Sequence, residues 1–197
     1  GSLPRPGDRR GSGLSRMESL HFVDACTSEH FFAMSRIHAL GWRTTYQDAV
    51  PAAYMAREIT DDRWVPSFRD NYESGRCHGL LLYNGNTPVV CCNYGPARAE
   101  DGAYSGWGEI ISFYAHPAEK GKGYGGLLME EALRRLRISG FSRCYVLVLR
   151  ENENARRFYS DHGFAWDGTQ VEVPLPPETV CTDLRYVRHF DEGRAPA

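Results

Sequence analysis

The segment Lys120-Gly121-Lys122-Gly123-Tyr124-Gly125-Gly126 contains the residues of this chain best suited to binding an anion. Glycine costs backbone entropy, so four glycines in six positions indicate that bare backbone is needed there. The N-terminus of a helix also offers unpaired N–H groups with partial positive charge. We therefore expect this segment and its two lysines to cradle a phosphate or pyrophosphate. The alternative is a flexible glycine-rich loop, which is the weaker reading because an apolar stripe begins inside the segment at Tyr124.

Two common classes of nucleotide site are not indicated. Gly121, Gly123 and Gly126 satisfy the pattern G-x-G-x-x-G, which alone is a weak signal. A dinucleotide site also has an acidic residue about 20 residues further on, where this chain has Val146-Leu147-Val148. The P-loop pattern G-x-x-x-x-G-K-[ST] does not occur.

The elements around the glycine segment place it between a strand and a helix. Residues 107–115 predict a strand, and apolar residues recur every four positions from Tyr124 to Leu136, which predicts a helix over about 123–139. Residues 143–149 form a continuous apolar run, typical of a strand covered on both faces. Asn152 is placed to cap a following helix over 153–162.

The remaining chain predicts further strands and helices. Upstream we expect a strand at 18–25, a helix from Thr27 to about Gln47, a second helical region over about 60–74, and a hairpin of strands 77–83 and 88–94. Downstream we expect strands near 163–167, 170–174 and 181–189. This order predicts an α/β (α+β) fold, with a mixed sheet and helices on both of its faces.

Two motifs of the chain resemble those of the GNAT superfamily of N-acetyltransferases. Residues 109–126 resemble its acyl-CoA-binding motif, and the signature [Q/R]-x-x-G-x-[G/A] would fall on Lys120, Gly123 and Gly125, with a departure at the first position. A second family motif, N-x-x-A-x-x-F-Y-x-x-x-G-F, is matched at every fixed position from Asn152 to Phe164. The resemblance covers most of 18–190 and is weaker over 42–75.

The resemblance implies a single GNAT domain over 17–190 that uses acetyl-CoA as its co-substrate. Its sheet would have about six to seven strands, with strands 4 and 5 splayed apart after a bulge. The pantetheine arm would lie between them and pair with backbone groups of strand 4, at Phe113, Tyr114 and Ala115. An N–H near Tyr114 would polarise the thioester carbonyl, and the pyrophosphate would rest on the N–H groups of 121–126. Further cofactor-binding residues implied by the second motif are Asn152, Ala155 and Phe158.

Acetyl transfer to an amine needs a proton for the leaving thiolate and a base for the amine. The resemblance implies Tyr159 as the general acid, because a phenol with a pKa near ~10 stays protonated at neutral pH. The alternative for Tyr159 is packing between a helix and the sheet. Glu109 is the best candidate for the general base, and strand alternation predicts that it shares an apolar face with Trp107, Ile111 and Phe113. The alternative for Glu109 is a solvent-facing or structurally paired carboxylate.

The acceptor site is the least determined part of the chain. Trp42, Tyr46 and Tyr54 fall where members of the family build an acceptor wall, although residues of these types more often belong to the core. Arg156 and Arg157 are expected on a solvated face rather than on the phosphates of the coenzyme.

Composition excludes several other classes of protein. A net charge of −2 argues against a nucleic-acid partner, and no run approaches the ~18–20 apolar residues of a membrane helix. The six cysteines have no metal-ligand spacing, so we expect reduced thiols, no metal and a cytoplasmic location. We expect residues 1–16 to be a disordered tail or a remnant of cloning, and 191–197 to be a C-terminal tail.

The sequence thus predicts an N-acetyltransferase that moves an acetyl group from acetyl-CoA directly to a primary amine of a small molecule or peptide. Two alternatives stay open: an acyl-CoA-binding regulatory module without turnover, and a transferase of a longer acyl group. The resemblance also leaves a homodimer open.

Overall fold

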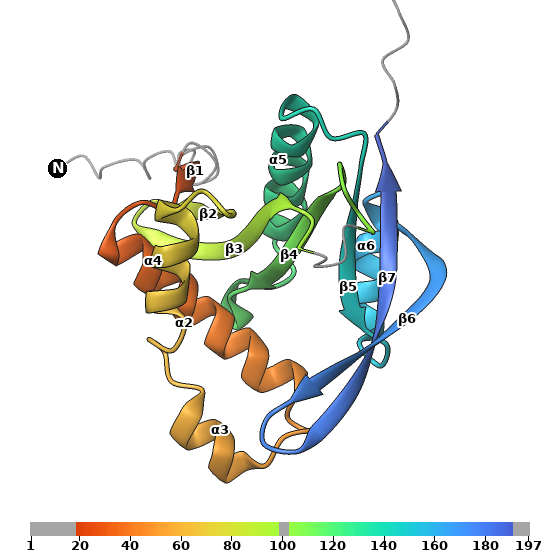
Figure 1. The fold of residues 1–197 in the computed structure, drawn as a ribbon. Coiled ribbons are helices and arrows are strands. Elements are labelled where there is room, and N and C mark those ends of the chain that lie inside the picture. The colour runs from red at the N-terminus through yellow and green to blue at the C-terminus, as the bar shows by residue number, and fades with distance from the viewer. Residues whose placement is uncertain (1–18, 99–102, 191–197) are drawn as a thin grey trace, which may run out of the picture.

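The computed structural model describes residues 19–98 and 103–190, so both predicted tails lie outside the described residues. The described residues form a seven-stranded sheet with the order β1-β2-β3-β4-β5-β7-β6 (Figure 1). β4 and β5 are parallel, and the other neighbouring strands are antiparallel. The strands are β1 (Leu20–Asp24), β2 (His78–Asn84), β3 (Thr87–Pro96), β4 (Gly108–Ala115), β5 (Arg143–Leu149), β6 (Ala165–Leu175) and β7 (Thr179–His189). The helices are α2 (Ser28–Thr45), α3 (Ala52–Glu58), α4 (Val65–Glu73), α5 (Tyr124–Ile138) and α6 (Glu153–Asp161), with a 3-10 turn at Pro117–Glu119.

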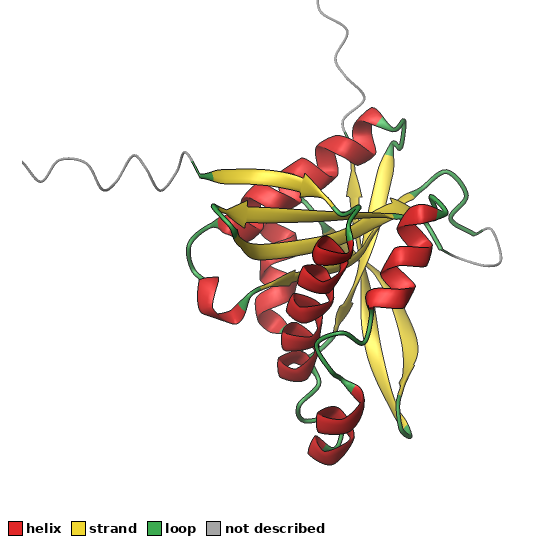
Figure 2. Ribbon diagram, turned by 90° about the vertical axis from the view of Figure 1, so that its left-hand side faces the viewer, coloured by secondary structure: helices red, strands yellow, loops and turns green. Residues whose placement is uncertain are grey.

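Helices cover both faces of the sheet (Figure 2). α5 and α6 pack on one face, where the largest core cluster includes Leu128, Tyr159 and Ile110. α2 and α4 pack on the other face through a second cluster that includes Met34. A third cluster, around Trp42, joins the end of α2 and α3 to the β6–β7 hairpin. This mixed α/β architecture confirms the predicted fold class.

Local sequence explains the two helices that border the site. α2 begins after Thr27, whose hydroxyl accepts a hydrogen bond from the backbone N–H of His30 at 3.2 Å, as an N-cap residue does. α5 begins after Gly123, which has φ +79°, a conformation that favours glycine. The apolar stripe of α5 is buried against the sheet at Leu128, Met129, Ala132, Leu133 and Leu136.

β4 and β5 pair over three residues and then separate. The paired residues are Gly108–Ile110 of β4 and Cys144–Val146 of β5. β4 stays paired with β3 along its other edge, from Gly108 to Ala115. Residues 111–115 of β4 and 147–149 of β5 therefore share no ladder, and we call this region the β4–β5 fork. It is the splay that the resemblance implied.

A bulge at Ile111 changes which face the residues of β4 present. The Cα partners in β3 are Tyr94 for Ile110 and Asn93 for Ser112, so Ile111 has no partner. An extra residue reverses the alternation of side chains. Ile110 and Phe113 accordingly contact the same core, on the side of α5 and α6.

Two stretches differ from the sequence prediction. The helical region expected over about 60–74 is α4, Val65–Glu73, and a further short helix that was not expected, α3, follows Pro51 directly at Ala52–Glu58. The two strands expected near 163–167 and 170–174 are one strand, β6, whose register shifts between Trp166 and Gln170. The alternation of side chains is lost where the register shifts, so in the sequence this part of β6 resembles a break between two strands.

Candidate active site

The glycine segment forms an open turn ahead of α5. Gly121 and Gly123 have φ +82° and +79°, and a Cβ added at either would meet no atom within 4 Å. No side chain caps the first turn of α5, so its leading N–H groups are left for another partner. Lys120 is exposed, and Lys122 forms an ion pair with Glu119 at 2.7 Å. The turn has the backbone shape and charge of an anion site.

Aromatic side chains line the path from this turn to the fork. The rings of Phe113 and Phe158 lie 5.3 Å apart between centroids. A Cβ at Gly125 would lie 3.5 Å from the ring of Phe158 and 3.7 Å from that of Phe113. The hydroxyl of Tyr124 accepts a hydrogen bond from the side-chain amide of Asn84, which ties the turn to the β2–β3 hairpin. The residues predicted to bind the cofactor on β4, α5 and α6 are therefore neighbours.

Three tyrosines from different parts of the chain lie around the fork. Tyr159 comes from α6 on one face of the sheet, Tyr46 from the end of α2 on the other, and Tyr114 from β4 itself. Burial, and then the proximity of Tyr46, raises the pKa of Tyr114, and burial together with Cys92 and Tyr46 raises that of Tyr159. Tyr46 thus influences the pKa of both tyrosines beside the part of β4 that has no ladder to β5. The ring of Tyr114 also lies so close to Gly41 of α2 that this position has no room for a Cβ.

Tyr159 has the properties that a general acid needs. It is 6% exposed, and its hydroxyl makes no hydrogen bond with any described residue. Burial is the largest cause of its raised pKa, so the phenol stays protonated across the neutral range. It also packs against Phe164 and Phe158, so the packing role is present as well.

Glu109 lies in a different environment from the one predicted. Because of the bulge, Phe113 faces α5 and α6, while Glu109 lies opposite Tyr145 on the other face. The prediction that Glu109 and Phe113 share a face is therefore wrong. Glu109 is 1% exposed, and its carboxylate accepts hydrogen bonds from the Arg98 backbone N–H and Nε at 3.1 Å, from Arg98 Nη2 at 2.9 Å and from the Tyr145 hydroxyl at 3.0 Å. It is a structurally paired carboxylate, the alternative that the sequence left open.

The start of α6 confirms the predicted capping role of Asn152. The side chain of Asn152 caps α6 by accepting a hydrogen bond from the N–H of Ala155 at 3.1 Å. Arg157 is exposed, as expected. Arg156 is partly buried, and its Nε donates to the Tyr186 hydroxyl at 3.0 Å.

The three aromatic residues proposed for the acceptor wall belong to one cluster. Trp42 is 9% exposed and lies 4.6 Å from the ring of Tyr46, and Tyr54 packs at the edge of the same cluster. The cluster also contains Leu149, the last residue of β5. Tyr46 therefore packs in the core and also lies beside the fork.

Sequence reasoning missed Asp183 of β7. Its Cα partner in β5 is Leu149, at the open end of the fork. Burial and the neighbouring Glu151 raise the pKa of Asp183 to about 6. The signal in the sequence was a carboxylate inside an apolar strand, between Cys181 and Leu184, but its relation to β5 depends on a pairing of distant segments.

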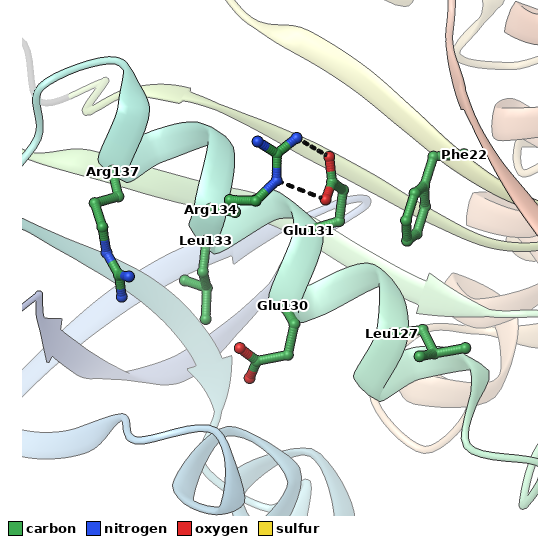
Figure 3. Close-up of a pocket in the computed structure, with 7 residues that line it drawn as sticks. All are labelled: Phe22, Leu127, Glu130, Glu131, Leu133, Arg134 and Arg137. Carbon is green, nitrogen blue, oxygen red and sulfur yellow. Dashed lines mark hydrogen bonds and ion pairs between the residues drawn. The ribbon is translucent and has the colours of Figure 1, made fainter.

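Other features of the described residues lie away from the fork. A shallow cavity of about 410 Å³ on the outer side of α5 is lined by Phe22, Leu127, Glu130, Glu131, Leu133, Arg134 and Arg137, with Arg134 paired to Glu131 (Figure 3). A second cavity of about 270 Å³ lies between α2 and α3. Within the described residues no three His, Cys, Asp or Glu side chains gather as metal ligands. None of the described helices is both long and apolar enough to span a bilayer.

Comparisons with known proteins agree with this geometry. The chain is 26% identical over 142 residues to the uncharacterized N-acetyltransferase YuaI of Bacillus subtilis. The aligned residues cover 78% of that protein and 70% of this chain. Its fold matches that of the PaiA N-acetyltransferase of Thermoplasma acidophilum in complex with coenzyme A, with a TM-score of 0.66, 15% identity and coverage of 87% and 99% of the two chains. It also matches yncA, a putative acetyltransferase of Salmonella typhimurium with its cofactor acetyl-CoA, with a TM-score of 0.65, 18% identity and coverage of 91% and 98%.

The family model of the GNAT acetyltransferases matches residues 34–164, which include most of α2, the whole fork and α6. This match spans more than half of the chain and contains both motifs. The chain therefore belongs to the GNAT acetyltransferase family.

Proposed function

We propose that this protein transfers an acetyl group from acetyl-CoA to a primary amine by direct attack within a ternary complex. The observation that carries the proposal is the β4–β5 fork, which has an uncapped glycine turn at one side and, beside it, the Tyr159 hydroxyl, which bonds to no described residue. Two solved structures of the same fold, one in complex with coenzyme A and one with acetyl-CoA, support the choice of co-substrate.

The chain offers a binding group for each part of the coenzyme. The N–H groups of 121–126 and the charge of Lys120 would hold the pyrophosphate. The free edge of β4 at Phe113, Tyr114 and Ala115 would pair with the amide groups of the pantetheine arm, as an added strand does. A backbone N–H near Tyr114 would stabilise the oxyanion that forms when the amine attacks the thioester.

The reaction needs one proton to be given and one to be taken. The amine nitrogen bonds to the thioester carbon, the carbon–sulfur bond breaks, and Tyr159 would donate its phenolic proton to the departing sulfur. Glu109 remains a proposed base, but its carboxylate already accepts from Arg98 and Tyr145, so a role in holding the end of the fork is better supported. Trp42 and Tyr46 would border the acceptor.

A thiol-release assay tests the proposed function. Purified protein is mixed with a panel of amines and with acetyl-CoA, propionyl-CoA or succinyl-CoA, and free thiol is followed with a colour reagent. We expect release that depends on both substrates and is fastest with acetyl-CoA. Faster release with a longer thioester would change the acyl group, and tight coenzyme binding without release from any amine would identify a coenzyme-binding module.

A further inference from the structure

Asp183 lies on the face of β7 that is turned toward Trp42 and Tyr46, the residues proposed to border the acceptor. Its neighbours in sequence, Leu184 and Tyr186, belong to the core under α5 and α6. Side chains alternate along a strand, so Asp183 faces the opposite side, as does Cys181, which packs in the cluster of Trp42 and Tyr46. Asp183 therefore shares the side of the sheet covered by α2.

The carboxylate of Asp183 has no partner within the described part of the chain. It makes no hydrogen bond or ion pair with any described residue, although its residue is half-buried. The groups that interact with its charge are Tyr46 directly after α2, Tyr114 of β4, Cys181 of β7 and Glu151 after β5. The nearest cation on its own strand face, Arg185, is paired with Asp167. A half-buried carboxylate that no described donor engages is free to accept a hydrogen bond from an incoming amine.

A second unpartnered group points to the same place from the other side of the sheet. Tyr159 is 6% exposed, and its hydroxyl also lacks a partner within the described residues. Tyr159 packs in the core that includes Phe113 of β4, and Tyr46 packs in the cluster that includes Leu149 of β5, so both side chains border the fork from opposite faces. A proton donor and a proton acceptor that both lack partners are arranged as a transfer site requires.

We propose that Asp183 binds the attacking amine of the acceptor and takes up its proton during transfer. This inference rests on the proposed function and places Asp183, rather than Glu109, in the role of the base. As the carbon–nitrogen bond forms, one N–H proton passes from the amine to the Asp183 carboxylate. The carbon–sulfur bond then breaks, and the sulfur receives the proton of Tyr159. The products are the amide and free coenzyme A, and the two side chains re-equilibrate through solvent.

The position of Asp183 suits this role better than that of Glu109. Glu109 lies on the closed part of β4, where the strand still pairs with β5, and it is fully engaged by Arg98 and Tyr145. Asp183 lies opposite Leu149, three residues beyond the last paired residue of β5, Val146.

The test uses Asp183→Asn, which keeps the size of the side chain and removes its charge. Glu172→Gln of β6 is the matched control, because it makes the same change of charge on the neighbouring strand at an exposed position. We expect Asp183→Asn to lower kcat by roughly 10²–10³-fold at neutral pH while coenzyme affinity changes less than about twofold. The control should keep wild-type kcat. A kcat for Asp183→Asn close to wild type would overturn the proposal.

A pH profile separates a base from a structural residue. The activity of the wild type should fall as the pH drops below about 6, the pKa of Asp183, because the base becomes protonated. Glu151→Gln should move this acid limb to lower pH, because Glu151 contributes to the raised pKa of Asp183. An acid limb that stays in place in both variants would contradict the role of Asp183.

Calorimetry of amine binding to the complex with coenzyme A is independent of turnover. Binding to the wild type that is lost in Asp183→Asn supports the inference, even if the wild type releases no thiol, in which case only the proposed function fails. If the amine binds equally to the wild type and to Asp183→Asn, or to neither, the inference is overturned. The proposed function is then decided by the thiol-release assay alone.

Discussion

At the scale of single residues, the site depends on which side chains are already engaged and which are left without a partner. Glu109 is held by two neighbours, whereas Tyr159 is 6% exposed and its hydroxyl makes no hydrogen bond to any described residue. A group that already accepts several hydrogen bonds gives up stability when it changes partner, whereas a group without one gains a partner when substrate binds. The two residues therefore predict opposite mutant phenotypes.

Removing the Tyr159 hydroxyl should impair chemistry and leave binding intact. We expect Tyr159→Phe to lower kcat by roughly 10²-fold, because the leaving thiolate loses its proton donor. Coenzyme affinity and melting temperature should change little, because the ring still packs against Phe164. Steady-state kinetics and calorimetry check this, with Tyr83→Phe on β2 as the control. A kcat equal to that of the wild type would remove Tyr159 from the acid role.

Removing the charge of Glu109 should lower stability first. We expect Glu109→Gln to reduce the free energy of unfolding by about 1–2 kcal/mol, a value discounted because the Arg98 side chain is largely exposed. Denaturant unfolding measures this, with Glu172→Gln as the control. Unchanged stability together with a large loss of kcat and an altered pH–rate profile would instead identify Glu109 as the base.

At the scale of elements, the glycine turn can be tested without disturbing the helix that follows it. Gly123 and Gly75 have nearly equal backbone angles, φ +79° and +74°, and a Cβ at either would meet no protein atom within 4 Å. Alanine should cost each protein about 1 kcal/mol through the left-handed conformation alone. Only Gly123→Ala should also weaken coenzyme binding, by tenfold or more, because its Cβ enters the space intended for the pyrophosphate. Equal affinities in the two variants would contradict the cradle.

The inner face of α2 should make the fold sensitive to acid. His38 is packed between Trp64 and Tyr114, and burial lowers its pKa from 6.5 to about 3. Between these two values the unfolded chain binds a proton at His38 that the folded protein does not, so the contribution of His38 to stability is present above pH 6.5 and is lost as the pH falls toward 3. Urea unfolding from pH 7 to pH 4 should show a shallower loss of stability for His38→Phe. His21→Phe, at an exposed position, is the control. If the stability of His38→Phe falls with pH as steeply as that of the wild type, His38 is not a buried neutral imidazole.

At the scale of the whole molecule, coenzyme should stabilise the protein most strongly at the fork. At a concentration of 100 times Kd, binding adds about 2.7 kcal/mol to the stability of the folded state. Amide exchange should slow most at 111–115 of β4, which lack a ladder toward β5, and at the start of α5. Mass spectrometry with and without coenzyme A checks this, and protection confined to the outer cavity of α5 would place the ligand elsewhere.

Local patterns predicted much of this molecule, and long-range pairings account for most of what was missed. The ends of α2 and α5 follow from Thr27 and Gly123, which act within one turn of their own helices. The bulge at Ile111 depends on how β3 pairs with β4, so simple alternation placed Glu109 and Phe113 on one face. Asp183 reaches the fork only because β7 pairs with β5, which the sequence of either strand does not reveal.

The fork leaves the sheet joined across its middle by three residue pairs and by the helices that flank it. If the pantetheine arm completes that seam, the co-substrate is also a structural part of the protein, present for each turnover and then released. The concentration of the thioester would then determine the rigidity of the protein as well as its turnover rate. Molecules of the protein without a bound acyl donor would then be the ones that proteases degrade most readily.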